Sequence, residues 1–492
     1  MMLYSFLITE RLSDRQVVLT DCRENYTYRD IDELSGKIEC ALKQFGLKRN
    51  DRVLLLAEHT VATVMILMAC MRMGVCFAPI PPRISPWALE VLTKDALPAL
   101  IIGDHGPNGV RRISPGELMA LSAGKRVSEP ECVRADTVCY ILYTSGSTDQ
   151  PKGVVALEKN VKFCIEAINR RLRNSASDRI LCCLPLSFDY GLYQVFLALA
   201  SGACLVLPPD VPLPSIISLL AKERITGFPA MPSMLNLLLK TRLLNKVNLD
   251  HMRYVTSTGD VFSIELIRRI SASIPSAEIL PMYGLTECKR VAVMPLNRRD
   301  KTLAGSCGLP LDGVSVWLEH PDERGVGELV VSGENVMSGY WNDLAATKTC
   351  FYFDADKGHC FRTGDIFRID DEGYLYFVGR KKLILKVNGY RIGIIELESF
   401  LLKAMGDVVN ELAVSGCPDE IMGEKIEVFV WASASCEVVI ERLTQVSKAL
   451  PPYQRPHFLC FSNRPLPKNA NGKTDRTFLK EMALQNERIP LR

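Results

Sequence analysis

Short apolar runs alternate with longer amphipathic stretches in the first half of the chain, and this alternation constrains the fold more than any other feature. Residues 30–46 and 215–225 carry apolar side chains at helical spacing. Four apolar runs are typical of buried strands: 52–57 (RVLLLA), 99–103 (ALIIG), 179–186 (RILCCLPL) and 204–209 (CLVLPP). Strands that alternate with helices predict parallel sheets covered by helices, so we expect an α/β protein.

The pattern changes twice further along the chain. Residues 314–319, 325–333 and 373–380 are strand-like segments separated by glycine, which predicts a small β-rich subdomain. A new α/β pattern then begins, with helices expected at 394–405 and 437–449 and strands near 411–415 and 425–431. We therefore predict a large N-terminal body, residues 1–381, and a small mobile α+β C-terminal domain, residues 382–492.

Composition places the chain among ordinary globular proteins. It has 492 residues, of which 48% are hydrophobic and 23% charged, with a formal net charge of +3. This balance predicts no nucleic-acid partner. The 17 cysteines include no CxxC pair, and the six histidines show no zinc spacing. We expect reduced, mostly buried thiols and a cytoplasmic protein.

Residues 60–80 form the one candidate membrane span in the sequence. Arg72 interrupts this apolar stretch, and Pro79 stands near its end. Both features favour a buried helix that runs into a buried strand. The N-terminus also lacks the basic start and long apolar core of a signal peptide. The sequence therefore predicts no membrane partner.

A hydroxyl-rich loop, YTSGSTDQPKGV at residues 143–154, is the first candidate for chemistry. Small hydroxyl side chains and glycine N–H groups can face anionic oxygens, and a nearby lysine supplies positive charge. The spacing from Gly146 to Lys152 differs from a Walker A loop, and Gly153 follows the lysine. The loop can be either a polar turn or a phosphate-binding segment.

Four further segments each suit a nucleoside triphosphate. In MYGLTE (282–287), Tyr283 can stack on a base, Thr286 can reach a phosphate and Glu287 can bind Mg²⁺. In FRTGD (361–365), Asp365 is expected at the end of a turn between strands, where its carboxylate can accept ribose hydroxyls. The remaining two segments are GRKKLILKVNGYRI (379–392), with Arg380, and PKNANGKTDR (467–476), with Lys473.

The order and spacing of these five segments resemble the AMP-forming acyl-adenylate superfamily, which includes acyl-CoA synthetases, adenylation domains of nonribosomal peptide synthetases, and luciferases. The resemblance extends over nearly the whole chain. It implies a two-step reaction that uses ATP and Mg²⁺. A carboxylate and ATP first give acyl-AMP and pyrophosphate, and a thiol then displaces AMP to form a thioester.

The resemblance also implies roles for individual residues. Lys473 would bridge the attacking carboxylate and the α-phosphate, and Thr286 and Glu287 would act beside it, with Glu287 holding the metal. Lys382 would be the hinge about which the C-terminal domain rotates between the two steps. The residues expected to bind the nucleotide are Thr144, Ser145, Gly146, Ser147, Thr148, Lys152, Gly259, Tyr283, Asp365 and Arg380. Asp149 replaces the family's second loop glycine, and its carboxylate should repel a triphosphate unless it points outward or helps to hold the metal.

The substrate pocket is expected between residues 184–203 and 282–293. In the amino-acid-activating branch of the family, an aspartate at the place of Asp189 holds the substrate ammonium. The other expected pocket residues are Tyr190, Tyr193, Pro229, Thr256, Thr258, Met282, Arg290 and Val291. Two tyrosines and a methionine favour a small acid. Arg290 can pair with Asp189, pair with a second carboxylate on the substrate, or turn outward.

Three functions remain open from the sequence. The first is a freestanding adenylation enzyme that loads a small amino or related acid onto a separate phosphopantetheinylated carrier protein, because no carrier domain follows Arg492. The second is an AMP-forming CoA ligase for a small or medium acid, since the residues around Asp189 also resemble bacterial acyl-CoA ligases. The third is a catalytically silent nucleotide-binding or scaffold protein, suggested only by Asp149.

Overall fold

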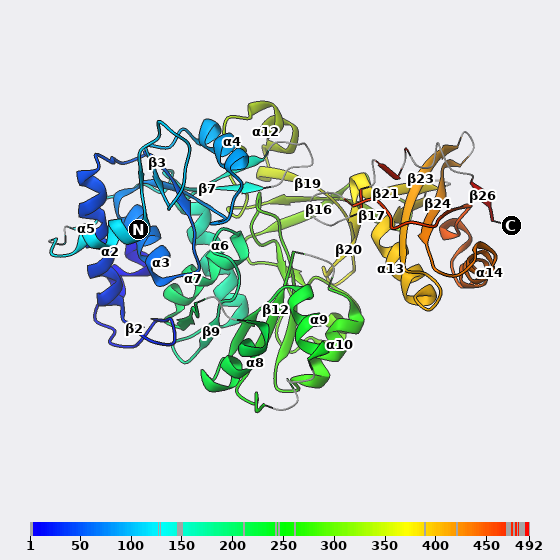
Figure 1. Ribbon diagram of the computed structural model, residues 1–492, viewed down its shortest axis with the longest axis horizontal. Coiled ribbons are helices and arrows are strands. Elements are labelled where there is room, and N and C mark those ends of the chain that lie inside the picture. Colours follow the sequence, from blue (N-terminus) through cyan, green and yellow to red (C-terminus); the bar gives the residue numbers. More distant parts are fainter. Residues whose placement is uncertain are drawn as a thin grey trace. The chain divides into compact units, whose positions relative to one another are not determined.

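The computed structural model describes residues 3–491 except 126, 128, 145–150, 210–211, 242–243, 245–246, 260–261, 388–389, 420–421, 469–473, 476–477, 480 and 482–487. The chain forms two compact units. The first comprises residues 1–316, 331–362 and 371–375, and the second comprises 317–330, 363–370 and 376–492 (Figure 1). The boundary predicted between residues 381 and 382 remains a prediction.

Two large sheets form the framework of the first unit, and most of their strand pairs are parallel. The order of the six-stranded sheet is β6-β5-β3-β4-β7-β8. Its strands are β3 (Arg52–Leu56), β4 (Cys76–Ile80), β5 (Leu100–Ile102), β6 (Arg112–Ile113), β7 (Val138–Thr144) and β8 (Lys152–Leu157). The α/β fold predicted from the alternation of strands and helices is confirmed.

The nine-stranded sheet has the order β15-β14-β13-β12-β11-β9-β10-β1-β2. Its strands are β1 (Leu19–Thr20), β2 (Asn25–Tyr26), β9 (Arg179–Leu181), β10 (Cys204–Val206), β11 (Gly227–Pro229), β12 (Tyr254–Ser257), β13 (Glu278–Tyr283), β14 (Ala292–Val293) and β15 (Leu309–Pro310). The strand expected over 179–186 ends at Leu181, and the chain then runs as a loop to the next helix.

Helices pack against these sheets and complete the first unit's core. Leu220, Leu235 and Leu266 come from α8, α9 and α10 and belong to one buried cluster with the sheet residue Val255, and Figure 1 shows these helices beside β12. The helices are α1 (Leu3–Leu7), α2 (Tyr28–Gln44), α3 (Val61–Met73), α4 (Pro86–Ala96), α5 (Pro115–Ser122), α6 (Glu158–Leu172), α7 (Asp189–Ser201), α8 (Leu213–Lys222), α9 (Pro232–Lys240), α10 (Ile264–Ser273), α11 (Arg299–Leu303) and α12 (Leu344–Cys350).

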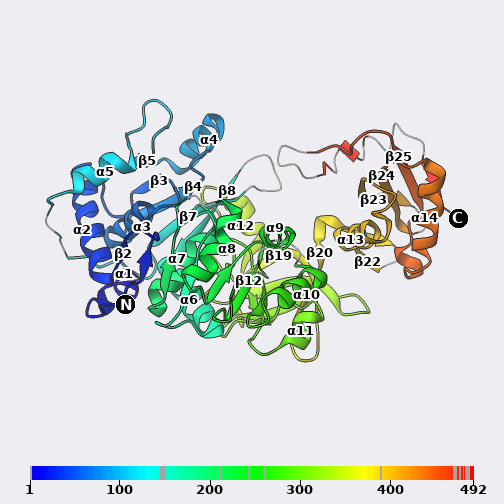
Figure 2. The ribbon, with the colours of Figure 1, turned by 60° about the horizontal axis from the view of Figure 1, so that its bottom comes forward.

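The stretch over residues 60–80 folds as a buried helix, α3, followed by a buried strand, β4, as predicted. Figure 2 shows α3 lying with α2 and α5. Thr60 caps the start of α3, and Gly74 ends it in the left-handed conformation that glycine adopts easily. Among the described residues, no helix is long and apolar enough to span a membrane.

Arg72 is buried in α3 at the centre of a charged cluster. Its Nε donates to Glu39 Oε2 at 2.7 Å, and its Nη1 donates to the Tyr4 hydroxyl at 3.0 Å and to Asp32. Glu39 is also buried and pairs with Lys43 at 2.8 Å. The charge that interrupts the apolar run is therefore neutralised by carboxylates of α2, which ties α3 to its neighbour.

The β-rich part has the strand order β16-β17-β19-β18, with β20 paired to β19. Its strands are β16 (Ser315–Glu319), β17 (Val326–Ser332), β18 (Phe351–Asp354), β19 (Gly358–Ile369) and β20 (Leu375–Arg380). The turn expected at Asp365 is wrong, because this residue lies inside the long strand β19. Gly364 has a φ of +69°, so a local twist of the backbone occurs there while strand pairing continues.

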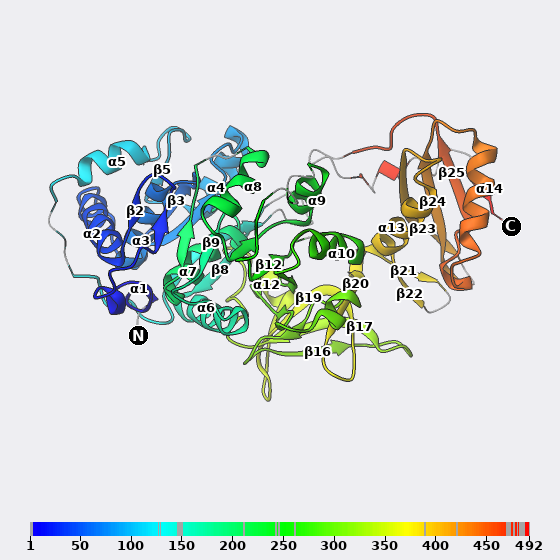
Figure 3. The ribbon, with the colours of Figure 1, turned by 90° about the horizontal axis from the view of Figure 1, so that it is seen from below.

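The C-terminal part of the second unit is a six-stranded sheet with two helices on one face (Figure 3). Its helices are α13 (Ile394–Met405) and α14 (Cys436–Ser447), as expected apart from the ends of α14. Leu397 and Leu443 from these helices share one core with Val428 of the sheet. The strands are β21 (Ile384–Val387), β22 (Tyr390–Gly393), β23 (Glu411–Asp419), β24 (Gly423–Trp431), β25 (Phe458–Ser462) and β26 (Ile489–Pro490).

The Arg72 cluster gives a test of the first unit's stability. Arg72→Met should lower the free energy of unfolding by about 3–5 kcal/mol, because it leaves the buried carboxylate of Glu39 with one partner fewer. The control is Arg134→Met, which breaks an exposed pair with Asp136 and should change stability by less than about 1 kcal/mol. Urea denaturation followed by fluorescence measures both. Equal losses in the two variants would contradict the structural role of Arg72.

Candidate active site

The carboxyl ends of β11, β12 and β13 form one edge of the nine-stranded sheet, because these neighbouring strands are parallel. Ligands of open α/β sheets bind outside the carboxyl ends of the strands. The residues predicted to line the site at these ends are Pro229 on β11, Thr256 on β12, Thr258 and Gly259 just after β12, and Met282 and Tyr283 at the end of β13. The fold therefore brings six predicted site residues to one edge.

A tight turn follows β13. A Cβ at Gly284 would lie 1.8 Å from the carbonyl oxygen of Lys289, so only glycine permits this approach. Lys289 itself has a φ of +45°, a left-handed conformation that a residue with a side chain rarely adopts. The turn carries Thr286 and Glu287 and returns the chain so that Val291 N–H donates to the Tyr283 carbonyl at 3.0 Å.

Lys289 is the partner of Asp189, which begins α7. The Lys289 Nζ lies 3.0 Å from Asp189 Oδ2 and 2.8 Å from its backbone oxygen. The side chain of Lys289 is 1% exposed and that of Asp189 is 24% exposed. The suggested pairing of Asp189 with Arg290 is wrong, because the neighbouring lysine occupies that carboxylate. Lys289 was not identified from the sequence as a site residue, although it lies between the candidates Glu287 and Arg290.

Charge and burial compete at this pair. Burial and the positive charge of Arg290 together lower the pKa of Lys289 to about 8, although the negative charge of Asp189 opposes them. Burial also disfavours the charged form of Asp189, but the charges of Lys289 and Arg290 outweigh it and hold the pKa of that carboxyl below its usual value. The Lys289 Nζ lies 3.8 Å from the centre of the Tyr193 ring, which adds a cation–π contact.

Arg290 points inward and joins a different group of predicted pocket residues. Its Nη1 donates to Thr258 Oγ1 at 2.9 Å, and its guanidinium lies 5.3 Å from the centre of the Tyr190 ring. Tyr190 in turn shares a 2.8 Å hydrogen bond with Thr256. Arg290 is 3% exposed, so the outward orientation considered from the sequence is wrong. Its buried Nε has no hydrogen-bond partner among the described residues.

The predicted phosphate loop connects the strands of a hairpin. Thr144 ends β7 and pairs with Lys152, the first residue of β8. The loop residues Ser145, Gly146, Ser147, Thr148 and Asp149 lie outside the described residues. Thr144 and Lys152 are half-buried, which leaves both able to reach a ligand at the end of the hairpin.

Tyr340 connects this hairpin to the turn after β13. Its hydroxyl donates to Glu287 Oε1 at 2.8 Å, and the Lys152 Nζ lies 5.0 Å from the centre of its ring. Tyr340 N–H also donates to Thr347 Oγ1 at 2.9 Å, which fixes the residue against α12. Burial, and then the negative charge of Glu287, raise the pKa of Tyr340, so its hydroxyl keeps its proton and remains a donor.

The donor set on these elements fits a nucleotide and a metal ion. Glu287 offers a hard carboxylate oxygen, the ligand type that Mg²⁺ prefers. Gly259 has a φ of +90°, and a Cβ there would lie only 3.0 Å from the Met231 methyl group, so both the backbone conformation and this close approach favour glycine after β12. Tyr283 is buried at the end of β13, with 8% of its surface exposed.

In the second unit, Asp365 and Arg380, both predicted to bind the nucleotide, form an ion pair with each other. Arg380 Nε lies 2.7 Å from Asp365 Oδ1, and the Asp365 side chain is buried. The backbone of Lys382 lies in a short 3-10 helix, Lys381–Leu383, which joins β20 to β21. Lys473 lies outside the described residues.

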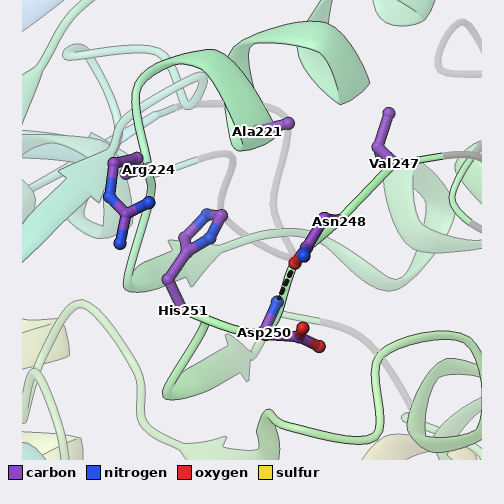
Figure 4. A pocket seen from close by; sticks show the side chains of 6 residues that line it. All are labelled: Ala221, Arg224, Val247, Asn248, Asp250 and His251. Atoms are coloured by element: carbon purple, nitrogen blue, oxygen red, sulfur yellow. Dashed lines mark hydrogen bonds between the residues drawn. The ribbon is translucent and has the colours of Figure 1, made fainter.

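A cavity of about 640 Å³ lies elsewhere on the first unit. It opens beyond the end of α8 and is lined by Ala221, Arg224, Val247, Asn248, Asp250 and His251 (Figure 4). Asp250 N–H donates to the Asn248 side chain at 2.8 Å, so the polar groups of its wall are partly used within the loop. None of the predicted site residues lines it.

Comparison with known proteins agrees with the resemblance drawn from the motifs. The model of the AMP-binding enzyme family matches residues 9–341. Bacitracin synthase 2 from Bacillus licheniformis is 28% identical over 490 residues, which cover 96% of this chain and 18% of the synthase. The 4-coumarate–CoA ligase CCL1 from Humulus lupulus is 27% identical over 523 residues, which cover 99% of this chain and 94% of the ligase.

A solved structure shows a similar fold over the whole length. ATP-bound MatB from Rhodopseudomonas palustris superposes with a TM-score of 0.84 at 26% identity, covering 97% of this chain and 98% of MatB. The chain thus matches full-length ligases as well as one segment of a much longer synthase. It belongs to the AMP-binding enzyme family and is an AMP-forming acid–thiol ligase.

Proposed function

We propose that the protein activates a small carboxylic acid as acyl-AMP, with release of pyrophosphate, and then transfers the acyl group to a thiol. The contacts that join Asp189, Lys289, Tyr190 and Arg290 beside the Glu287 turn support an acid site and a nucleotide site on one sheet edge. ATP and Mg²⁺ are the proposed cosubstrate and metal.

In this proposal the residues act mainly by neutralising charge. A carboxylate that approaches the α-phosphate meets an anionic centre, so the barrier falls when cations and N–H donors surround the reacting oxygens. Lys152 and the hydroxyl of Thr144 face the phosphates, and Lys473 contacts both oxygens of the forming bond. Glu287 would hold Mg²⁺, which would add positive charge beside the phosphate oxygens.

The ion pair of Asp189 with Lys289 supports one kind of acid over another. In an amino-acid site the aspartate must be available to the substrate ammonium. Here its carboxylate already has a cation at 3.0 Å, and Arg290 adds a second positive charge nearby. An incoming ammonium would meet two cations and one anion, which is unfavourable in a buried pocket. We therefore favour an acid without an α-ammonium group.

Activation of an amino acid is the second candidate. Two observations favour it: Asp189 stands at the position that the amino-acid branch uses, and bacitracin synthase 2 is 28% identical over most of this chain. For this candidate the substrate ammonium would have to displace Lys289 from Asp189. The lowered pKa of Lys289, about 8, makes a neutral lysine accessible under mildly alkaline conditions.

Either CoA or a phosphopantetheinylated carrier protein can supply the thiol. The match to 94% of a CoA ligase favours CoA. The match to one segment of a synthase favours a carrier protein. Both acceptors present the same phosphopantetheine thiol, so the chemistry of the second step is shared. Offering each acceptor to enzyme loaded with acyl-AMP separates the two.

A pyrophosphate-release assay over matched pairs of acids tests the proposed function. Each acid without an α-amino group should have a kcat/KM at least tenfold higher than that of its α-amino counterpart, a difference of about 1.4 kcal/mol. The reason is that Lys289 and Arg290 repel the ammonium group. Lys289→Met leaves Asp189 without its cation and should shift the preference toward the amino acid. Asp189→Asn should not raise kcat/KM for the acids without an α-amino group. A wild-type preference for amino acids would favour the second candidate, and no release with any acid would contradict both.

Lys473→Ala tests the role of this lysine in each of the two half-reactions. The substitution should nearly abolish acyl-AMP formation, since the lysine acts on the adenylation transition state. Thioester formation from preformed acyl-AMP should remain largely intact, because in the proposed cycle the C-terminal domain has then rotated the lysine away. Both steps are measured separately by rapid quench with radiolabelled acid. Equal losses in the two steps would contradict rotation about Lys382.

Tyr340→Phe tests the orientation of Glu287. Loss of the hydroxyl should raise the Mg²⁺ concentration for half-saturation about tenfold, because groups that orient a metal-binding carboxylate typically have this effect. Tyr26→Phe is the matched control, since it removes a 2.6 Å bond from a tyrosine to Glu24 outside the site. Calorimetric titration of Mg²⁺ into the ATP complex gives a readout independent of turnover. An unchanged Mg²⁺ affinity in Tyr340→Phe would show that the hydroxyl does not orient the ligand.

A further inference from the structure

The charged groups beside the sheet edge do not balance. Lys289 and Arg290 are both buried, and Asp189 is the carboxylate that lies close to them in the described part of the chain. Asp189 is engaged by Lys289 through two contacts. The cluster therefore keeps one positive charge, on Arg290, that no described carboxylate neutralises.

Arg290 is held in place but incompletely bonded. Thr258 accepts from its Nη1, and the Tyr190 ring lies under the guanidinium. The side chain is thus oriented on two sides by neighbours that carry no charge. Its Nε is buried and has no hydrogen-bond partner among the described residues. A buried donor without a partner is rare in folded proteins, and for a charged group its desolvation is expensive.

The position of Arg290 suggests which group would accept hydrogen bonds from its remaining N–H donors. Thr258 follows the carboxyl end of β12, and Arg290 is three residues from Glu287, so the guanidinium belongs to the edge where the acid is proposed to bind. A guanidinium offers parallel N–H groups that match the two oxygens of a carboxylate. Pairing there would also remove the surplus positive charge of the cluster.

We propose that Arg290 binds a second carboxylate of the substrate, so that the acid activated is a short dicarboxylic acid. This inference rests on the proposed function. One carboxylate reacts with ATP while the other is held by Arg290. Lys289, fixed on Asp189, keeps that aspartate from repelling the second carboxylate. The bulky side chains of Tyr190, Tyr193 and Met282 favour a short chain between the two groups.

The test compares dicarboxylic acids with monocarboxylic acids of the same number of carbons. Malonate, succinate and glutarate are paired with propionate, butyrate and pentanoate in the pyrophosphate-release assay. At least one dicarboxylate should exceed its partner by about tenfold to a hundredfold in kcat/KM, the range expected for a charge-assisted hydrogen bond. The preference should appear mainly in KM, because the second carboxylate does not react.

Variants of Arg290 connect the preference to this residue. Arg290→Gln should reduce the ratio of dicarboxylate to monocarboxylate activity at least tenfold, and Arg290→Lys should keep part of it because it retains the charge. Arg170→Gln removes an exposed arginine of the same unit and should leave the ratio unchanged. If Arg290→Gln does not fold, thermal unfolding of the wild type still reports binding, since malonate, succinate or glutarate should stabilise it more than the matched monocarboxylate.

The outcomes separate this inference from the proposed function. Pyrophosphate release with monocarboxylates at rates equal to the dicarboxylates would overturn the role of Arg290 and leave acid activation standing. A preference for dicarboxylates that survives in Arg290→Gln would also overturn it, because another group would then hold the second carboxylate. If none of the acids supports pyrophosphate release, acid activation is overturned together with the inference that rests on it.

Discussion

The close approach of the Lys289 carbonyl to Gly284 is the constraint on which the rest of the site depends. At 1.8 Å from an ideal Cβ position on Gly284, this oxygen excludes every residue but glycine there, and Lys289 itself has a left-handed backbone conformation. Because Gly284 and Lys289 are in contact across the turn, the side chains of Glu287, Lys289 and Arg290 point in fixed directions. One strained turn therefore positions the groups proposed for the metal and for the acid.

Much of the fold was predictable because its signals are local. Apolar runs and helical periodicity predicted the α/β framework, and Arg72 within residues 60–80 favoured a buried helix over a membrane span. Asp365 was placed wrongly because Gly364 suggests a turn, whereas its positive φ is accommodated within a continuous strand. A glycine in a strand-like run permits both outcomes, and the pairing of β19 with its neighbours decides between them.

The site was predictable in its members but not in its pairing. The motifs identified Asp189, Tyr190, Thr258 and Arg290, and the structure joins each of them to the same sheet edge. Lys289 and Arg290 are adjacent in the sequence, and their spacing from Asp189 does not show which of the two cations pairs with its carboxylate. In the proposed function, the pairing of Lys289 with Asp189 is the reason for favouring an acid without an α-ammonium group over an amino acid.

The turn after β13 is short, so it holds the proposed metal ligand close to the residues proposed to bind the acid. Glu287 is hydrogen-bonded to Tyr340, whose ring lies beside Lys152 at the start of β8, while Lys289 pairs with Asp189 in the proposed acid site. Any shift of the turn that adjusts the acid pocket therefore moves the metal ligand as well, because close-packed segments do not deform independently. In the proposed site, substrate recognition and nucleotide positioning are thus coupled through this turn, and a change of acid specificity at Lys289 or Arg290 must preserve the geometry of Glu287 to keep the proposed first step active.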